Sequence, residues 1–141
     1  MNRFIKQFGT GLIVGFLLAL LINGVANAAT GIDNNNPMNI RISADHWQGA
    51  TGDDGTFTQF ISPLMGIRAA AVVLRTYRDK HGLNTIAGIV NRWAPPFEND
   101  TRGYIKNVSF KLGIGVNIPL TDAYYVRLIG AMIYQENGQQ P

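Results

Sequence analysis

The hydrophobic residues of the second half of this chain recur with helical spacing. Four such stretches are flanked by residues typical of helix ends, so we predict four helices. They run from Pro63 to about His81, from Asn84 through Trp93, from Asn99 or Asp100 to Gly113, and from Thr121 to Gly138. Ser62 before the first helix and Gly82 after it are residue types that favour a start and a stop.

A shorter region before these helices has a strand-like pattern. Met38, Ile40 and Ile42 alternate with polar residues, and turn-forming residues follow from Gly49 to Gly55. This pattern predicts a small irregular β-hairpin between residues 37 and 60, after a polar and flexible lead-in over residues 29–36. The predicted fold class is therefore α+β, mostly helical, with about four helices and one small hairpin.

The first 28 residues have the composition of an export signal. Arg3 and Lys6 precede an apolar run, and Ala26-Asn27-Ala28 matches the small residues of a signal-peptide cleavage site. We predict cleavage at Ala28–Ala29, which leaves residues 29–141 as a single domain. The apolar run is also long enough for an uncleaved membrane anchor. In either case we expect the domain to be exported, into a periplasmic or extracellular space.

Charge and composition narrow the classes of partner. Two of the 12 Lys and Arg residues lie in the leader, which leaves ten against nine acidic residues. A nearly neutral domain without a basic run does not favour nucleic acid as a partner. The chain has no cysteine, and His46 and His81 are too far apart for metal-ligand spacing. We therefore expect no metal and no organic cofactor.

The last predicted helix carries an apolar face that ends in a carboxylate. Residues at three- and four-residue steps share this face, namely Tyr125, Leu128, Ile129, Met132, Ile133 and Glu136. Partial burial and the negative end of the helix dipole both raise the pKa of a carboxyl group there. A general acid needs to hold its proton near neutral pH in this way. The alternative is a helix that simply ends in solvent, with Gly138 as its stop.

Three local motifs resemble a family of small phage and prophage proteins associated with virus particles. They are Asn35–Arg41 followed by Trp47-Gln48-Gly49 and Phe57–Phe60, the run Arg92–Thr101 with Tyr104 after it, and Gln135–Gly138. The resemblance covers residues 31–141, and Arg92–Thr101 is its most specific part. It implies an association with virions, or with the envelope, rather than a particular chemistry.

The motif order also resembles, more distantly, lysozyme-like glucosaminidases of the flagellar-muramidase type. Asn35-Asn36 to Ile40-Arg41, then Trp47-x-Gly49, then Phe57-x-x-Phe60 and a long helix follow the family order, with Phe60 in place of a Tyr. The family's catalytic helix, which ends in Glu, comes before these motifs, whereas the helix ending in Glu136 comes last. The resemblance thus implies a circularly permuted lysozyme-like fold.

This second resemblance suggests roles for six residues. Glycan cleavage needs a carboxylic acid and usually a second carboxylate, so Glu136 and Glu98 are the candidate catalytic residues. Glu98 has an alternative role as a charge at the start of the following helix. The candidate substrate-binding residues are Asn36, Asn39, Trp47 and Tyr104. Turn formation by the asparagines and core packing by the aromatic residues are the alternatives.

Two neighbouring side chains receive other roles. We assign Trp93 to the core, and Arg92 is a candidate to hold the carboxylate of Glu98 or Glu136. If the permutation is right, the Asn-rich segment and the end of the last helix lie side by side.

The sequence predicts an exported peptidoglycan-cleaving glycosidase or lytic transglycosylase of phage origin. Its partners would be peptidoglycan glycan strands, and membrane contact is expected only through an uncleaved leader. The alternative is a non-enzymatic virion or envelope structural protein that binds glycan or another subunit. Fold alone does not separate these functions.

Overall fold

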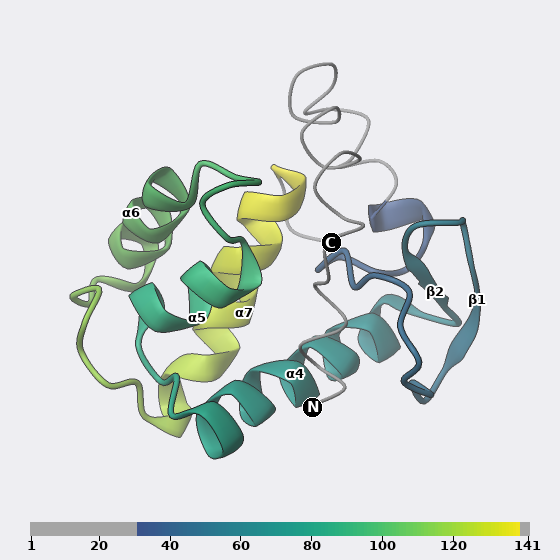
Figure 1. Cartoon of the computed structure of the whole chain (residues 1–141), viewed down its shortest axis with the longest axis horizontal. Helices are drawn as coiled ribbons and strands as arrows, with labels where there is room; N and C mark the ends of the chain where they lie inside the picture. The colour runs from purple at the N-terminus through teal and green to yellow at the C-terminus, as the bar shows by residue number, and fades with distance from the viewer. Residues whose placement is uncertain (1–30, 139–141) are drawn as a thin grey trace.

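The computed structural model describes residues 31–138, and in this part of the chain four helices lie beside a small hairpin (Figure 1). The helices are α4 (Pro63–His81), α5 (Ile86–Trp93), α6 (Thr101–Leu112) and α7 (Asp122–Asn137). The antiparallel hairpin pairs β1 (Ala50–Asp53) with β2 (Thr58–Phe60), and a further helical turn covers residues 31–33. The predicted mostly helical α+β class is confirmed. The predicted leader, 1–28, and its cleavage site lie outside the described residues.

The helices begin and end close to the predicted positions. The Ser62 hydroxyl accepts a hydrogen bond from the Met65 N–H, and Asp100 accepts one from the Gly103 N–H at the start of α6. The prediction of Asn84 as the cap of α5 was wrong, because Thr85 accepts from the Gly88 N–H instead. The Asn84 carbonyl accepts from the Leu120 N–H, which ties the segment before α5 to the segment before α7.

The hairpin lies later in the chain than the alternation predicted. Met38 and Ile40 are buried while Ile42 is exposed, and none of the three is in a strand. Asn39 has a positive φ of 52°, a left-handed conformation that interrupts an extended strand. The segment still runs along β2, since the Thr58 N–H donates to the Ile40 carbonyl at 2.9 Å.

The described part of the predicted flexible lead-in, residues 31–36, is instead packed against the hairpin and α4. Asn34 is buried, and its side chain accepts from Gln59 and donates to Asp54. Gly66 on α4 permits a close approach, because a Cβ there would lie 2.3 Å from the Asn35 carbonyl oxygen. A polar segment is stable in this position because its amide groups are paired with partners on the hairpin.

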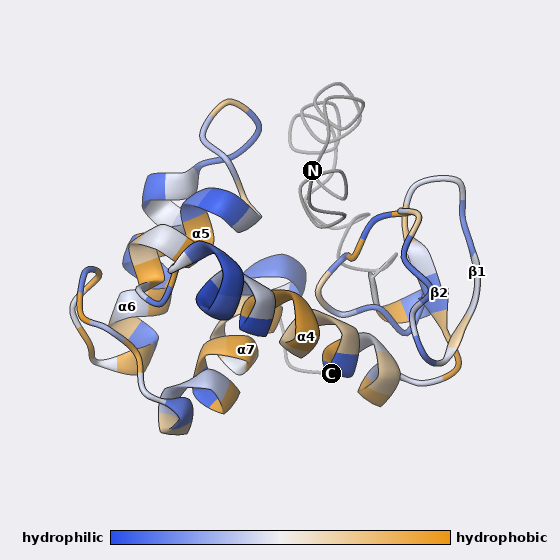
Figure 2. Cartoon of the chain, turned by 60° about the horizontal axis from the view of Figure 1, so that its bottom comes forward, coloured by the Kyte–Doolittle hydropathy of each residue, from blue (hydrophilic) through white to orange (hydrophobic). Residues whose placement is uncertain are grey.

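The core lies between the four helices and extends under the residue 38–40 segment. Figure 2 shows hydrophobic stretches of α4 and α7 beside one another. Tyr77 on α4 meets Trp93 on α5 edge to face, with ring centroids 6.4 Å apart. The apolar face predicted for α7 is confirmed, since Leu128, Met132 and Ile133 belong to this core. Because α7 is anchored along its length, the position of its last turn is fixed.

Candidate functional site at the end of the last helix

Glu136 lies in the last turn of α7, one residue before the helix ends at Asn137 and Gly138 takes the left-handed conformation. The residue is half-buried, and its carboxyl group faces three other parts of the chain. The carboxylate at the end of the α7 apolar face therefore lies at a junction between several elements of the fold rather than in solvent.

Three side chains donate hydrogen bonds to the Glu136 carboxylate. Oε2 accepts from Asn39 Nδ2 at 3.1 Å. Oε1 accepts from the Tyr104 hydroxyl at 3.1 Å and from Trp93 Nε1 at 3.2 Å. The donors come from the N-terminal segment, from α6 and from the end of α5, so the carboxylate joins parts of the chain that are distant in sequence.

Burial raises the pKa of Glu136, although the three hydrogen bonds and the charge of Arg41 act in the opposite direction. Burial, followed by the nearby Glu136 charge, also raises the pKa of the Tyr104 hydroxyl well above its usual range. Tyr104 therefore stays protonated and remains a donor to the carboxylate. The result is a carboxyl group that gives up its proton at a higher pH than an exposed glutamate does, while being held in one orientation.

The Asn-rich segment and the end of α7 lie side by side, as predicted. Besides the Asn39 contact, Asn137 Nδ2 donates to the Pro37 carbonyl at 2.6 Å and to the Ile133 carbonyl at 2.9 Å. Asn137 is 7% exposed, so this connection is inside the protein. The two ends of the described chain are thus joined through paired amide groups.

The other two candidate substrate-binding residues lie apart from the carboxylate. Asn36 is fully buried, and its Nδ2 donates to the carbonyls of Ile40 and Thr58 while its Oδ1 accepts from the Ile40 N–H. Trp47 lies in the turn before β1 and is half-buried against the core. Asn36 therefore holds the turn that presents Asn39, which is the role that the turn alternative describes.

Glu98, the second candidate carboxylate, is also inside the protein. It is 6% exposed, and burial raises its pKa while the charge of Arg41 lowers it. Among the described residues its Oε1 has no hydrogen-bond partner. Asp100, not Glu98, is the acid that caps α6. Glu98 is therefore a buried acid just before the start of α6, the position that the alternative interpretation describes, and it makes no capping hydrogen bond there.

Arg41 is a functional candidate that the sequence did not reveal. Its side chain is 9% exposed, and its guanidinium lies 5.2 Å from the centre of the Phe57 ring. Burial lowers the pKa of Arg41, and the charges of Glu98 and Glu136 raise it. The electrostatic partner of both glutamates is therefore Arg41. Arg92, which the sequence suggested, lies instead over the Tyr77 ring and 3.4 Å from His81.

Trp93 was assigned to the core, and it serves the site as well. Its ring is 6% exposed, while its indole N–H reaches Glu136. Buried tryptophans usually find an acceptor for this N–H, and this rule could have predicted a polar partner for Trp93. The sequence pointed to Arg41 only through its position in the Asn35–Arg41 motif, and that motif did not indicate a role for the side chain.

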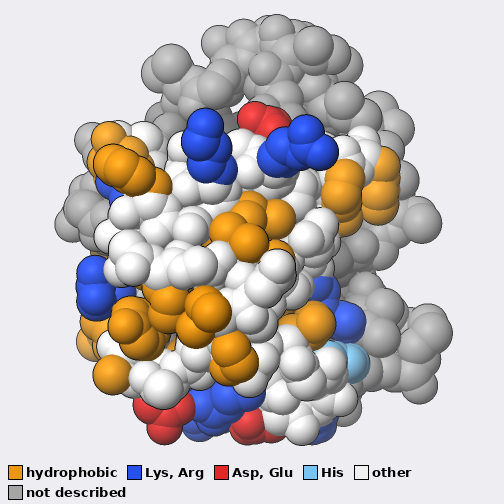
Figure 3. All heavy atoms as spheres, turned by 90° about the vertical axis from the view of Figure 1, so that its left-hand side faces the viewer, with side chains coloured by type: hydrophobic (Ala, Val, Ile, Leu, Met, Phe, Trp, Pro, Cys, Tyr) orange, Lys and Arg blue, Asp and Glu red, His pale blue; other side chains and the backbone are white. Residues whose placement is uncertain are grey.

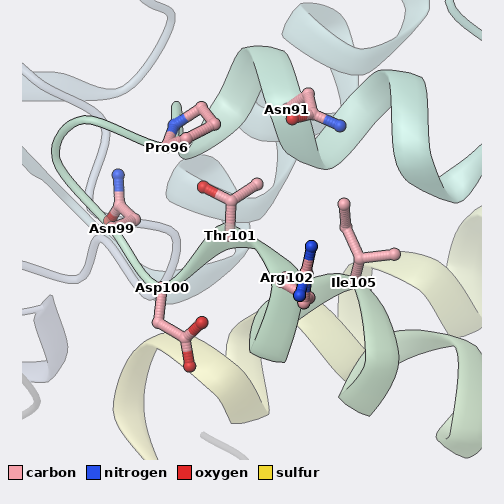
Figure 4. A pocket seen from close by; sticks show the side chains of 7 residues that line it. All are labelled: Asn91, Pro96, Asn99, Asp100, Thr101, Arg102 and Ile105. Carbon is pink, nitrogen blue, oxygen red and sulfur yellow. The ribbon is translucent and has the colours of Figure 1, made fainter.

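A separate cavity of about 430 Å³ opens between α5 and the start of α6 (Figure 4). The residues that line it include Asn91, Asn99, Thr101 and Arg102, and none of the six predicted site residues lines it.

Within residues 31–138, no group of three acidic or histidine side chains is arranged to hold a metal ion. None of the helices in this range has the length and hydrophobicity needed to cross a membrane.

Comparison with known proteins gives a phage relative. The chain is 46% identical to Protein P5 of Pseudoalteromonas phage PM2 in an alignment over 129 residues, which covers 88% of this chain and 81% of that protein. No protein-family model matches the chain. The similarity confirms that the predicted resemblance to phage proteins is real, and it assigns no chemistry.

Proposed function

Because this chain belongs to the family of Protein P5 of Pseudoalteromonas phage PM2, we propose that it is a phage-derived enzyme that cleaves peptidoglycan glycan strands. The reaction is that of a glycosidase or a lytic transglycosylase, and Glu136 is its general acid. A phage must cross the cell wall at entry and at exit, so local cleavage of this polymer suits a phage protein. An export address, with cleavage at Ala28–Ala29, belongs to the same proposal.

The Glu136 carboxyl group is the observation that carries the proposal. It has a raised pKa because it is buried, and three donors hold it in one orientation. A general acid must be protonated near working pH and must be aimed at the leaving oxygen. Structural carboxylates with several donors usually have a lowered pKa, so the raised value supports a role in proton transfer.

Glu98 supplies the second carboxylate of the proposed site. Its Oε1 is buried and lacks a hydrogen-bond partner among the described residues, and glycan cleavage usually requires a second carboxylate of this kind. Arg41 lies near both glutamates and offsets part of their repulsion when both are ionised. Asn39 and Tyr104, besides orienting Glu136, are the proposed contacts to the sugar.

The proposal includes a circularly permuted lysozyme-like arrangement. In the family pattern the catalytic helix precedes the Asn-rich segment, and a permutation requires these two parts to be neighbours in space. The hydrogen bonds of Asn39 and Asn137 across this junction support it. Proximity of the two ends is what makes permutation tolerable in folded proteins.

The direct test is a zymogram on purified peptidoglycan with the protein that starts at Ala29. The wild type should clear the gel, and Glu136→Gln should not, because the amide keeps the shape of the acid without its proton. Asp122→Asn is the matched control, since it makes the same chemical change at the exposed, opposite end of α7. Clearing by Glu136→Gln would remove this residue from the mechanism.

One observation favours the alternative of a non-enzymatic virion structural protein. Phe110 on α6 and Val126 on α7 are 87% and 81% exposed. Figure 3 shows several separate hydrophobic patches on the α6 side of the molecule, divided by polar and basic side chains. If this face contacts another subunit, Phe110→Ser should reduce incorporation into virus particles while leaving wall cleavage unchanged. Absence of cleavage by the wild type on every wall tested would favour this alternative.

A further inference from the structure

We infer that Gly31 is a positioning residue for Glu136, because its α-hydrogens form the surface against which the Asn39 amide oxygen packs while Asn39 Nδ2 donates to the carboxylate. The geometric part of this inference stands by itself. Its consequence for catalysis rests on the proposed function.

The contacts around Gly31 leave no room for a side chain. A Cβ built there would lie 2.7 Å from Asn39 Oδ1, 2.8 Å from Asn137 Oδ1 and 3.2 Å from the Asn36 carbonyl oxygen. The first two distances are shorter than real Cβ contacts, so a larger residue must displace both amides. Gly31 does not have a positive φ that would itself require glycine. The requirement therefore comes from the three oxygens, not from the backbone conformation.

Both amides are held in one orientation by their NH₂ groups. Asn39 Nδ2 donates to Glu136, and Asn137 Nδ2 donates to the carbonyls of Pro37 and Ile133. Neither Oδ1 has a hydrogen-bond partner among the described residues. Each oxygen faces instead the position that a Cβ of residue 31 would occupy.

This arrangement decides which atom of Asn39 faces the acid. If the amide rotated by 180°, Oδ1 would lie beside Glu136 Oε2, where it would repel the ionised carboxylate or accept the proton of the neutral one. In the second case the acid proton would be held by Asn39 rather than offered to a substrate. Close packing on Gly31 holds the amide in place, and donation to the carboxylate selects the orientation with Nδ2 toward Glu136, so the proton on Glu136 remains transferable.

The other groups around Glu136 are positioned independently of Gly31. Arg41 is paired with Phe57 in an isolated β-bridge, and Tyr104 belongs to α6. Glu98 lies in the loop between α5 and α6 and interacts with Arg41. A change at Gly31 should therefore act on the carboxyl group mainly through Asn39, which contacts it directly, while the charges nearby stay the same.

The test is a double-mutant cycle read out by the titration of the Glu136 carboxyl carbon in ¹³C NMR. The chain has two glutamates, so Glu98→Gln assigns the signals. Gly31→Ala should shift the Glu136 midpoint upward, because the Asn39 bond lowers this pKa and is lost. Asn39→Ala should shift it in the same direction. In the Asn39→Ala background, Gly31→Ala should shift the midpoint by less than it does in the wild type, because only its contact with Asn137 remains.

Gly88→Ala is the control for a glycine in another helix. A Cβ there meets Thr85 Oγ1 at 3.2 Å, at the start of α5 and at the opposite end of that helix from Trp93. This control should leave the midpoint unchanged. An unshifted midpoint in Gly31→Ala, or a shift of the same size in the Asn39→Ala background, would overturn the inference. If Gly31→Ala proves too unstable to titrate, urea unfolding provides the test. The unfolding free energy that Gly31→Ala removes should be smaller in the Asn39→Ala background than in the wild type, and an equal loss would also overturn the inference.

Activity provides a separate readout. In the cleavage assay, Gly31→Ala should move the alkaline limb of the pH profile upward together with the NMR midpoint. A protein that cleaves no wall, yet shows the expected titration cycle, would contradict the proposed function while supporting the positioning role of Gly31.

Discussion

The buried acid at the end of α7 should make the protein less stable as the pH rises, and Glu136→Gln should remove this dependence. Burial raises the pKa of Glu136 above 4.5 in the folded protein, while the unfolded chain titrates near that value. Between the two values the folded protein therefore binds more protons than the unfolded chain. Stability contributed by this group is full below the unfolded pKa and is lost as the pH rises through the folded pKa.

The magnitude follows from linkage. Each pH unit that separates the folded from the unfolded pKa corresponds to about 1.4 kcal/mol lost once Glu136 is fully ionised. Glutamine has no such titration. Its NH₂ group would face Asn39 Nδ2, and the loss of that hydrogen bond costs about 1 kcal/mol at every pH. The two effects are separable, because only the first changes with pH.

The assay is urea unfolding of the wild type and Glu136→Gln at a series of pH values from 4 to 8, with the difference in unfolding free energy plotted against pH. Glu98, whose pKa is also raised, and Asp54, whose pKa is lowered, are present in both proteins. Their contributions cancel in the difference to first order. We expect the variant to gain stability relative to the wild type as the pH rises. A flat difference, or one of opposite slope, would refute the reasoning.

Three further substitutions test the contacts that place the site. Asn137→Ala should lower the unfolding free energy by about 1–3 kcal/mol in urea, because it leaves the buried Pro37 carbonyl without its donor. Gly66→Ala should cost a similar amount, about 1–3 kcal/mol, since its Cβ would collide with the Asn35 carbonyl; an unchanged midpoint would disprove that close approach. Asp100→Ala should cost about 1 kcal/mol in thermal unfolding through loss of the α6 cap, whereas Asn should retain most of it.

The features that sequence patterns predicted are those fixed by local chemistry. Ser62, Pro63 and Gly82 specify the ends of α4 through hydrogen bonds and backbone conformations that involve neighbours along the chain. The α7 face is equally local, since helical periodicity alone places Glu136 next to Ile133 and Met132. The same reasoning failed at α5, where Asn84 and Thr85 are adjacent residues with similar capping ability and tertiary contacts decide between them.

The partners of Glu136 could not be predicted because they depend on contacts between distant parts of the chain. Alternation suggested a strand through Asn39, yet its left-handed φ turns the side chain toward α7. Arg41 becomes a neighbour of both glutamates only when the 38–42 segment is placed beside β2. The packing of Asn39 against Gly31 was harder still to predict. It requires the helical turn at residues 31–33 and the end of α7 to lie beside the same amide group.

The ionisable groups of this site are not arranged for maximal stability of the fold. Two buried carboxyl groups with raised pKa share one buried arginine whose own pKa is lowered, so the charged forms of all three are incompletely stabilised. Replacing such groups by apolar residues of similar volume is often neutral or stabilising in other proteins. A fold that needed only a junction between α7 and the N-terminal segment would have it already in Asn137 and the Pro37 carbonyl. Incomplete stabilisation of the charged forms is what the proposed role of Glu136 as a general acid requires.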